Sequence, residues 1–295
     1  MVPLPAGTGA NHGDLVDLAT ISPDRVAVRL EITGVVQGVG FRPYVHRLAF
    51  RHGLAGWVRN ASGEVQCEVE GTRPAIEAFV GKLREEAPPL ARIDQVKTRT
   101  VVPTGSDRFT IVQSADQVDG RQPVPPDAAI CSACEAELFD PADRRYRYPF
   151  ITCTDCGPRF TVIEALPYDR ERTSMRAFAQ CPACQQEYQS PADRRFHSET
   201  NSCSACGPRL WFQRDAAGSP IGDLAGLDRA AALLLEGGIL ALRGLGGFHL
   251  AVDATSEAAV VGLRARKHRE SKPLAVMVRD LEAARELGVI GRLEE

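Results

Sequence analysis

Features that would direct a chain to a membrane, an export route or nucleic acid are scarce in this sequence. No run of roughly 18 apolar residues occurs, so no segment is predicted to cross a bilayer, and no membrane partner is expected. The first residues, MVPLPAGTGANHGDLVDLATISPD, lack the basic stretch and apolar core of an export signal, so we expect a cytoplasmic protein. The net charge is −3, without the basic excess of nucleic-acid-binding domains, so nucleic acid is not expected among the partners.

The chain is long enough to hold about two or three domains, with 295 residues of which 44% are hydrophobic. Its early residues are rich in Gly, Pro and Ala and are predicted to be flexible. The segment VDGRQPVPPD has the Pro and Gly typical of a boundary. The predicted parts are a tail (1–25), a first domain (26–115), a linker (116–130), a cysteine-rich region (131–210) and a partial third domain (223–295).

The first domain alternates between the two hydrophobic periods. VAVRLEIT, residues 26–33, has the alternation of a strand, and a helical period begins at Phe41. LAGWVRN and EVQCEVEG read as a hairpin, Pro74 opens a second helix, and an extended stretch covers 91–114. The order βαββαβ predicts an α+β fold, the ferredoxin-like sandwich.

A glycine-rich loop joins the first strand to the first helix. Gly34, Gly38 and Gly40 precede the helix, and Arg42 lies at its entrance. Backbone N–H groups of such a loop can surround an anion, the helix dipole adds positive potential, and an arginine fork suits phosphate. Because turns also need glycine, a purely structural loop remains the alternative. The pattern nevertheless favours a phosphate site.

Three further residues of this domain invite a functional interpretation. His46 and His52 lie off the apolar stripe of the helix, so we expect both to be solvated surface residues without a catalytic role. Cys67 shares a face with Val65 and Val69 and is predicted to be a small buried hydrophobic residue.

Eight of the nine cysteines form four CxxC pairs within an internal repeat of about 50 residues. CSACEAELFDPADRRYRYPFITCTDCGPRF recurs as CPACQQEYQSPADRRFHSETNSCSACGPRL. Sets of four thiolates are the ligands of closed, structural Zn(II) sites. The predicted metal ligands are Cys131, Cys134, Cys153, Cys156, Cys181, Cys184, Cys203 and Cys206.

Disulfides and a redox CxxC are the alternatives, and the absence of an export signal together with the duplication favours zinc. The repeat favours one zinc per unit, hence two ions, while pairs interleaved between the units remain open. His197 stands where the first unit has Arg147, so it is not expected to be a ligand of the repeat. We expect metal binding to supply most of the folding energy of this region.

Lysine is absent between residues 131 and 210, where ten arginines face eleven acidic residues. Two four-cysteine zinc sites would add a charge of about −4 to this nearly neutral region. The balance favours a spacer or docking module over a nucleic-acid-binding one.

The third region has the pattern of an α/β domain. An Ala/Leu helix is closed by Gly237 and Gly238, an ILAL strand follows, a helix starts at Ser256, and PLAVMV, residues 273–278, is predicted to be a strand. RARKHRESKP, residues 264–273, is strongly basic, and on charge alone it indicates a solvated helix end.

The string VQGVGFR, followed by GLAGWVRN and GEV, resembles the acylphosphatase family over residues 26–115. The resemblance implies that Arg42 binds the phosphoryl oxygens and that Asn60 orients the attacking water, which makes these two the catalytic residues. It also implies a phosphate-binding loop made of Gln37, Gly38, Val39, Gly40, Phe41 and Arg42.

GGILALRGLGGFHLAVDAT, followed by K-x-R-x-S-K-P and an apolar stretch, resembles the YrdC-like domain. That resemblance implies nucleotide-binding residues at Lys267, Arg269, Ser271 and Lys272.

The succession of these three parts resembles the HypF family of carbamoyltransferases, which mature [NiFe] hydrogenases. It implies hydrolysis of carbamoyl phosphate, formation of carbamoyl adenylate from ATP with Mg, and transfer of the carbamoyl group to the C-terminal cysteine of a HypE-type acceptor. The family continues beyond the position of Glu295, so we expect an N-terminal fragment. The alternatives are a zinc-stabilised docking protein with an inactive acylphosphatase fold, against which Arg42 and Asn60 weigh, and an RNA-binding protein, against which the charge weighs.

Overall fold

The computed structural model describes residues 25–61, 63–115, 124–215, 217–244 and 246–291. Residues 1–24 of the predicted tail and residues 116–123 of the predicted linker lie outside this set. The chain divides into two compact units, one up to Pro208 and one from Arg209 onward.

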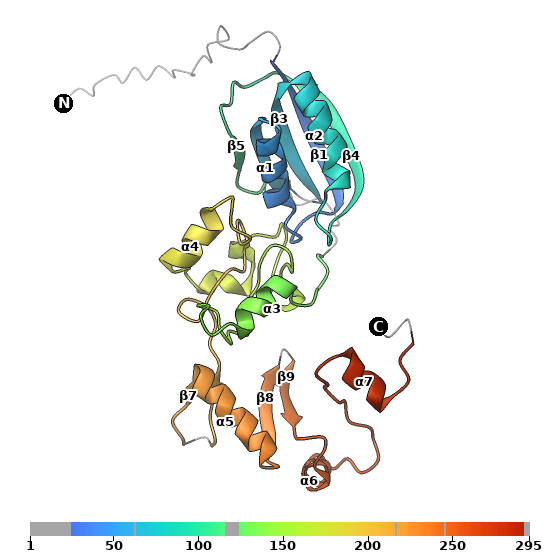
Figure 1. Ribbon diagram of the computed structural model, residues 1–295, viewed down its shortest axis with the longest axis vertical. Coiled ribbons are helices and arrows are strands. Elements are labelled where there is room, and N and C mark those ends of the chain that lie inside the picture. The colour runs from blue at the N-terminus through green and yellow to red at the C-terminus, as the bar shows by residue number, and fades with distance from the viewer. Residues whose placement is uncertain (1–24, 62, 116–123, 216, 245, 292–295) are drawn as a thin grey trace, which may run out of the picture. The chain divides into compact units, whose positions relative to one another are not determined.

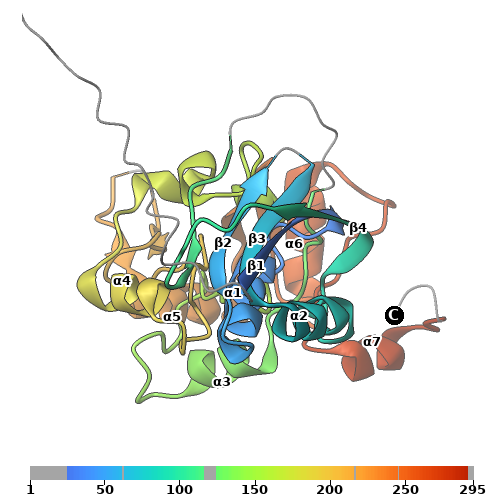
Figure 2. The same cartoon turned by 90° about the horizontal axis from the view of Figure 1, so that it is seen from above.

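The first unit begins with a five-stranded sheet in the order β4-β1-β3-β2-β5. Neighbouring strands are antiparallel except β2 and β5, which are parallel. Helices α1 and α2 cover the same face of the sheet (Figures 1 and 2). The predicted ferredoxin-like sandwich is therefore confirmed. The elements are β1 (Arg25–Val35), α1 (Phe41–Arg51), β2 (Ala55–Ala61), β3 (Glu64–Thr72), α2 (Arg73–Glu85), β4 (Arg92–Val101) and β5 (Phe109–Ile111).

The core of this unit lies between the sheet and the two helices. Alternate residues of the strands and one stripe of each helix point into it, as the two hydrophobic periods predict. Each fully buried aliphatic or aromatic side chain contributes roughly 1.5–3 kcal/mol. Cys67 is fully buried in this core, as predicted. Its larger members include Leu30, Ile32, Val45, Leu48, Val58, Val65, Phe79 and Leu83.

The predicted extended stretch over 91–114 is two strands, which lie at opposite edges of the sheet (Figure 1). The buried carboxylate of Glu70 holds the crossing between them, since it accepts hydrogen bonds from the backbone N–H groups of Thr104 and Gly105, both at 3.0 Å. Gly105 has a φ of 77°, a conformation that favours glycine.

The rest of the first unit, residues 131–208, is here called the finger module. It consists of short helices joined by loops: α3 (Ser132–Phe139), η2 (Phe160–Val162), η3 (Arg170–Arg172), η4 (Ser174–Ala177) and α4 (Pro182–Gln189). The two repeats fold alike, since α3 and α4 each start directly after the first cysteine of a repeat. Arg147 and His197, at equivalent positions, have φ values of 54° and 51°.

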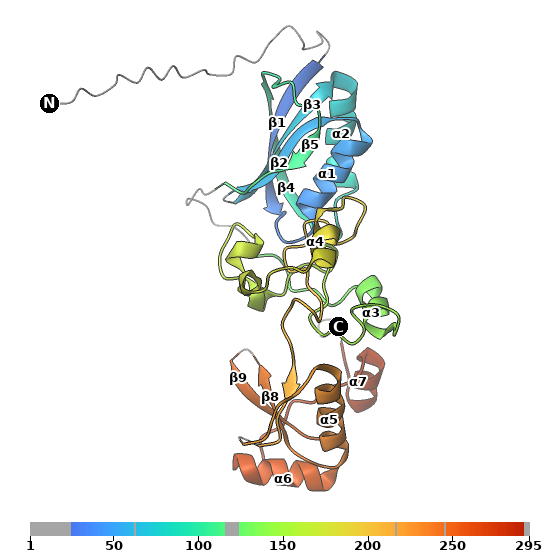
Figure 3. The same ribbon diagram turned by 90° about the vertical axis from the view of Figure 1, so that its left-hand side faces the viewer.

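The described residues of the second unit form two small hairpins and three helices (Figure 3). Helix α5 ends just before Gly237 and Gly238, and β8 follows, as predicted. Strand β9 was not predicted. The elements are β6 (Trp211–Phe212), β7 (Ile221–Gly222), α5 (Asp223–Leu235), β8 (Leu240–Gly244), β9 (Gly247–Ala251), α6 (Glu257–Lys267) and α7 (Leu281–Leu287).

The predicted strand over residues 273–278 is wrong. This segment has no regular secondary structure and pairs with no strand among the described residues, and Met277 is 95% exposed. An apolar run becomes an interior strand only when neighbouring strands and a covering layer bury it. None of the described helices is long and apolar enough to span a bilayer.

Candidate functional site

The loop between β1 and α1 leads into a helix N-terminus that no side chain caps. Gly38 and Gly40 have φ values of 71° and 72°, and Gly40 is the N-cap residue. No acidic residue lies in the first turn of α1. Because the first N–H groups of a helix have no partner within it, and the dipole is positive at this end, this loop is suited to an anion.

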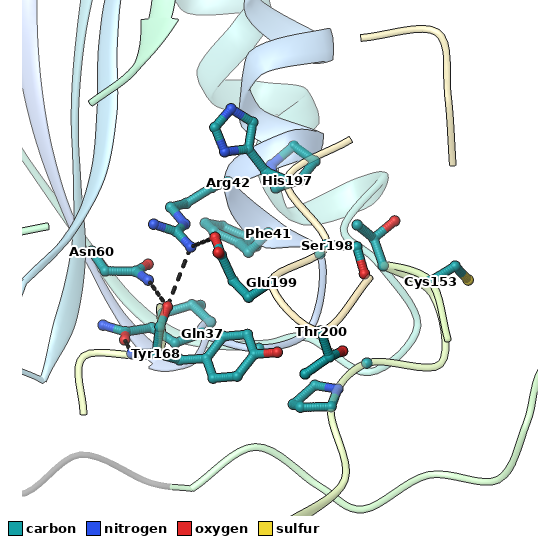
Figure 4. Close-up of a pocket in the computed structure, with 17 residues that line it drawn as sticks. Gln37, Phe41, Arg42, Asn60, Cys153, Tyr168, His197, Ser198, Glu199 and Thr200 are labelled. Atoms are coloured by element: carbon teal, nitrogen blue, oxygen red, sulfur yellow. Dashed lines mark hydrogen bonds and ion pairs between the residues drawn. The ribbon is translucent and has the colours of Figure 1, made fainter. Parts of the chain in front are cut away.

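Arg42, in the first turn of α1, is 7% exposed and binds two carboxylates. Nη1 donates to Oδ1 of Asp169 and Nη2 donates to Oε1 of Glu199, both at 2.7 Å (Figure 4 shows the second contact). Burial by itself would lower the pKa of Arg42, but Glu199 and Asp169 raise it above its ordinary value. The two carboxylate oxygens therefore contact the guanidinium fork as two oxygens of a phosphate would.

Asn60 and Arg42 donate to the same oxygen atom. Nδ2 of Asn60 lies 3.0 Å from the carbonyl oxygen of Tyr168, and Nη2 of Arg42 lies 3.2 Å from it (Figure 4). Gln37 accepts a hydrogen bond from the backbone N–H of Tyr168 at 3.2 Å. Asn60 is 1% exposed, and its Oδ1 has no hydrogen-bond partner among the described residues. The unpaired Oδ1 of Asn60 thus lies close to the carbonyl oxygen of Tyr168, to which Asn60 and Arg42 both donate.

The finger module and the segment before it close over the glycine loop. A Cβ atom at Gly38 would lie 2.6 Å from Cγ of Pro125 and 3.2 Å from Cγ of Pro158. A Cβ atom at Gly40 would lie 3.0 Å from the carbonyl oxygen of Thr154. The cavity that remains beside the loop has a volume of about 30 Å³. In this arrangement the carboxylates of Asp169 and Glu199 occupy the fork of Arg42.

Glu199 is 4% exposed, and the finger module supplies its other partners. The backbone N–H of Arg170 donates to Oε2 at 3.2 Å. The hydroxyl of Tyr188 lies 3.2 Å from Oε1 and 3.1 Å from Oε2. Burial raises the pKa of Glu199 above its ordinary value, against the opposing effect of Arg42.

Sequence reasoning placed Arg42, Asn60 and Gln37 together, and the structure brings them together. It missed Tyr168, Asp169 and Glu199. The signal that could have found Glu199 is a difference between the repeats. The second unit has the polar string SETN, residues 198–201, where the first has YPFI, and Glu199 stands at the position of Pro149.

His46 is not the solvated residue that was expected. Its ring packs edge-to-face on Phe109 and Phe196, with centroids 5.9 and 5.0 Å away, because the finger module contributes Phe196 to this surface of α1. Burial lowers the pKa of His46. His52 is half-buried at the C-cap of α1. His197 contacts the hydroxyl of Tyr188 at 3.2 Å and joins neither cysteine cluster.

The eight predicted ligands form two clusters, one in each repeat. The measured Sγ–Sγ distances run from 3.6 to 3.9 Å. Four sulfurs bound tetrahedrally to zinc at about 2.3 Å lie about 3.8 Å apart, so both donor sets fit a zinc ion. The four cysteines of each repeat lie together, which fits one ion per repeat and not the interleaved pairing. The clusters are Cys131, Cys134, Cys153, Cys156 and Cys181, Cys184, Cys203, Cys206.

An arginine of each repeat contacts the cysteine cluster of the other repeat. Arg144 of the first repeat donates to Sγ of Cys184 at 3.2 Å, and Arg194 of the second donates to Sγ of Cys134 at 3.1 Å. A four-thiolate zinc site carries a net charge of about −2, which these guanidinium groups partly offset.

Two ion pairs also join the repeats, one in each direction. Arg145 binds Glu187 of the second repeat, and Arg195 binds Glu137 of the first. Both arginines are almost completely buried. The two clusters are thus parts of one interlocked module, not independent fingers.

The predicted nucleotide-binding residues lie in the second unit, at the end of α6 and in the loop after it. Lys267 is the last residue of α6, and Arg269 is half-buried, whereas Ser271 and Lys272 are exposed. Arg264 fixes this loop, because its Nη1 donates to the carbonyl oxygens of residues 269, 270 and 272.

Comparison with known families places three matches along the chain. The acylphosphatase family model matches residues 28–111, the HypF finger model matches residues 130–163 and 181–213, and the telomere recombination model matches residues 232–294.

Longer proteins match nearly the whole chain. The carbamoyltransferase HypF2 of Cupriavidus necator is 53% identical over 272 residues, which cover 92% of this chain and 34% of that protein. The carbamoyltransferase HypF of Rhizobium leguminosarum bv. viciae is 52% identical over 270 residues, 91% of this chain and 33% of that protein. The crystal structure of a full-length HypF in a phosphate- and nucleotide-bound form matches with a TM-score of 0.82 and 43% identity, over 93% of this chain and 36% of that one. The chain spans about a third of the length of these relatives.

Proposed function

The chain belongs to the HypF family of carbamoyltransferases, and we propose that its acylphosphatase site hydrolyses carbamoyl phosphate. In this reaction the oxygen of a water molecule attacks phosphorus and the bond from phosphorus to the carbamoyl oxygen breaks. Inorganic phosphate and carbamate leave. The leaving group is good, so the site needs charge neutralisation and a positioned water more than a strong nucleophile.

Arg42 and the N–H groups of residues 37–42 bind the phosphoryl oxygens, and Asn60 holds the water. The observation that supports these roles is the shared oxygen atom, since Arg42 and Asn60 both donate to the carbonyl of Tyr168. An oxygen of the reacting group at that position would be bound by both side chains. The unpaired Oδ1 of Asn60 can then accept a hydrogen bond from the attacking water.

Substrate entry requires Arg42 to exchange its two carboxylate partners for the phosphoryl group. The fork of Arg42 is taken by Asp169 and Glu199. The phosphoryl oxygens would replace these carboxylate oxygens. We therefore expect hydrolysis to depend on the arrangement of the finger module.

The two cysteine clusters would hold zinc in a structural role. Each set has four thiolates and so leaves no open coordination position for a substrate. Bound zinc would supply crosslinks that keep Tyr168, Asp169 and Glu199 in place.

The later steps belong to the longer protein. Lys267, Arg269, Ser271 and Lys272 would contact ATP, bound with Mg, as carbamate and ATP form carbamoyl adenylate and pyrophosphate. The thiolate of the C-terminal cysteine of a HypE-type acceptor would then attack the carbamoyl carbon and release AMP. We expect the protein to work in the cytoplasm, where such an acceptor keeps its thiol reduced.

The test is phosphate release from carbamoyl phosphate by the 295-residue chain, without nucleotide and with zinc content measured on the same sample. Release that rises in proportion to protein concentration above the uncatalysed rate would support the proposal. A zinc-loaded chain that adds nothing to the uncatalysed rate would contradict it.

A further inference from the structure

Glu199 places a buried carboxylate beside an anion-binding loop, and the hydrolysis reaction does not explain why it is there. Glu199 is 4% exposed and its Oε1 lies 2.7 Å from Nη2 of Arg42, the group proposed to hold the phosphoryl oxygens. A carboxylate in this position repels any acyl phosphate. We therefore expect Glu199 to make a favourable contact with the correct substrate that offsets this repulsion.

The finger module, and not Arg42 alone, fixes the carboxylate. Arg170 donates its backbone N–H to Oε2, and the hydroxyl of Tyr188 reaches both oxygens. Nδ1 of His197 in turn lies 3.2 Å from that hydroxyl. These partners would keep Glu199 beside the site when a phosphoryl group takes Arg42.

Oε1 then loses its charged donor while it stays buried. Among the described residues, only the hydroxyl of Tyr188, which Oε1 shares with Oε2, then remains near Oε1, and a buried charged acceptor that lacks donors is costly. A substrate that brings an N–H group to this position restores a hydrogen bond. The amide nitrogen of a carbamoyl group carries two hydrogens that it can donate, next to the acyl-phosphate bond. The methyl group of acetyl phosphate has none to donate.

We propose that Glu199 is a specificity-determining residue of the acylphosphatase site and accepts a hydrogen bond from the amide nitrogen of the carbamoyl group. This inference rests on the proposed function. It gives the finger module a chemical role, because the second repeat supplies a carboxylate where the first has Pro149.

The experiment measures kcat/KM for carbamoyl phosphate and for acetyl phosphate, with wild-type chain and with Glu199→Gln. Wild type prefers carbamoyl phosphate, and the substitution lowers that preference roughly tenfold or more, because the repulsion against acetyl phosphate is removed along with the need for a donor. An unchanged ratio of the two kcat/KM values overturns the inference. So does an equal loss on both substrates.

Two further variants separate specificity from stability. Glu137→Gln breaks an ion pair of the same module, with Arg195, far along the chain from any group that contacts Arg42. It should leave the ratio unchanged, and a comparable fall in this control would overturn the inference. Tyr188→Phe keeps the carboxylate but removes its hydroxyl partner, and should lower the ratio less than Glu199→Gln.

If Glu199→Gln fails to bind two zinc ions, Tyr188→Phe serves as the test instead. An unchanged ratio of the two kcat/KM values in Tyr188→Phe then counts against the role of Glu199. The two proposals fail differently. A wild-type chain that hydrolyses neither substrate contradicts the proposed function, whereas one that hydrolyses both equally well overturns only the role of Glu199.

Discussion

Oε1 of Glu199 lies 2.7 Å from Nη2 of Arg42, although 157 positions separate the two residues in the chain. The first belongs to a cysteine repeat and the second to the glycine loop of the sheet domain. This contact joins the finger module to the acylphosphatase site within one compact unit. Changes in either part should therefore be detectable in the other.

Replacement of Asn60 by alanine removes both the donor to the shared oxygen and the unpaired acceptor. We expect kcat for carbamoyl phosphate to fall by about 10² or more, with a small change in KM, because positioning of the water is lost while Arg42 still binds phosphate. Initial rates of phosphate release measure this. Arg59→Ala, on the same strand and stacked on Trp57, is the control that should keep its rate. Equal rates for Asn60→Ala and wild type would remove Asn60 from the mechanism.

Gly38→Ala tests how closely the finger module and the segment before it approach the loop. The substitution places a Cβ atom 2.6 Å from Pro125 at a residue with positive φ, so it should lower the free energy of unfolding by more than the roughly 1–2 kcal/mol of the left-handed conformation alone. Gly53→Ala is the matched control, because Gly53 has a φ of 62° and nothing within 4 Å of the added atom. Urea unfolding compares them. An equal loss in the free energy of unfolding for both variants would mean that neither Pro125 nor the finger module contacts the added atom.

The metal content should follow the two clusters. Cys184→Ser is expected to lose the zinc ion of the second repeat and to weaken the first, because Arg194 of the damaged repeat contacts Cys134. Cys67→Ser, whose cysteine lies in the core of the sheet domain, should keep two ions. Metal analysis and competition with a chelator measure both effects. A Cys184→Ser chain that keeps one ion at wild-type affinity would show that the repeats bind independently.

Acid should destabilise the first unit in part through His197. Burial, together with the charges of Arg42 and His46, lowers the pKa of His197 to about 3, so the neutral ring is favoured in the folded protein. The stability that this residue contributes is fully present above its ordinary pKa of 6.5 and is lost as the pH falls toward 3. Between about pH 7.5 and 5.5, wild type should lose on the order of 1 kcal/mol more than His197→Asn.

Asparagine is chosen because it tolerates the positive φ of this position. Unfolding of both proteins at saturating zinc gives the comparison, and only the difference between the two pH slopes is interpreted. Parallel slopes would mean that another group carries the acid sensitivity.

The parts of this fold that could be predicted from the sequence depend on local spacing. CxxC pairs hold their sulfurs close together, so the clusters follow from the repeat itself. The glycine loop and Asn60 were located by short motifs, and the structure places them together because β2 pairs with β3 beside β1.

The parts that could not be predicted depend on contacts between distant segments. Nothing near Glu199 in the chain indicates that it meets Arg42, and His46 was misjudged because Phe196 covers it from another domain. The stretch at 91–114 divides because Glu70, on a different strand, binds the backbone of Thr104 and Gly105. The apolar run at 273–278 satisfied the strand pattern but lacks a partner among the described strands.

The most direct test of the account is phosphate release from carbamoyl phosphate by Arg42→Ala, compared with wild type and with Arg51→Ala. Arg51 lies on the same helix but is exposed and pairs with Glu86, so its loss should not change the rate. The account predicts that Arg42→Ala loses about 10² or more in kcat/KM while retaining two zinc ions. An Arg42→Ala chain that releases phosphate as fast as wild type would contradict it.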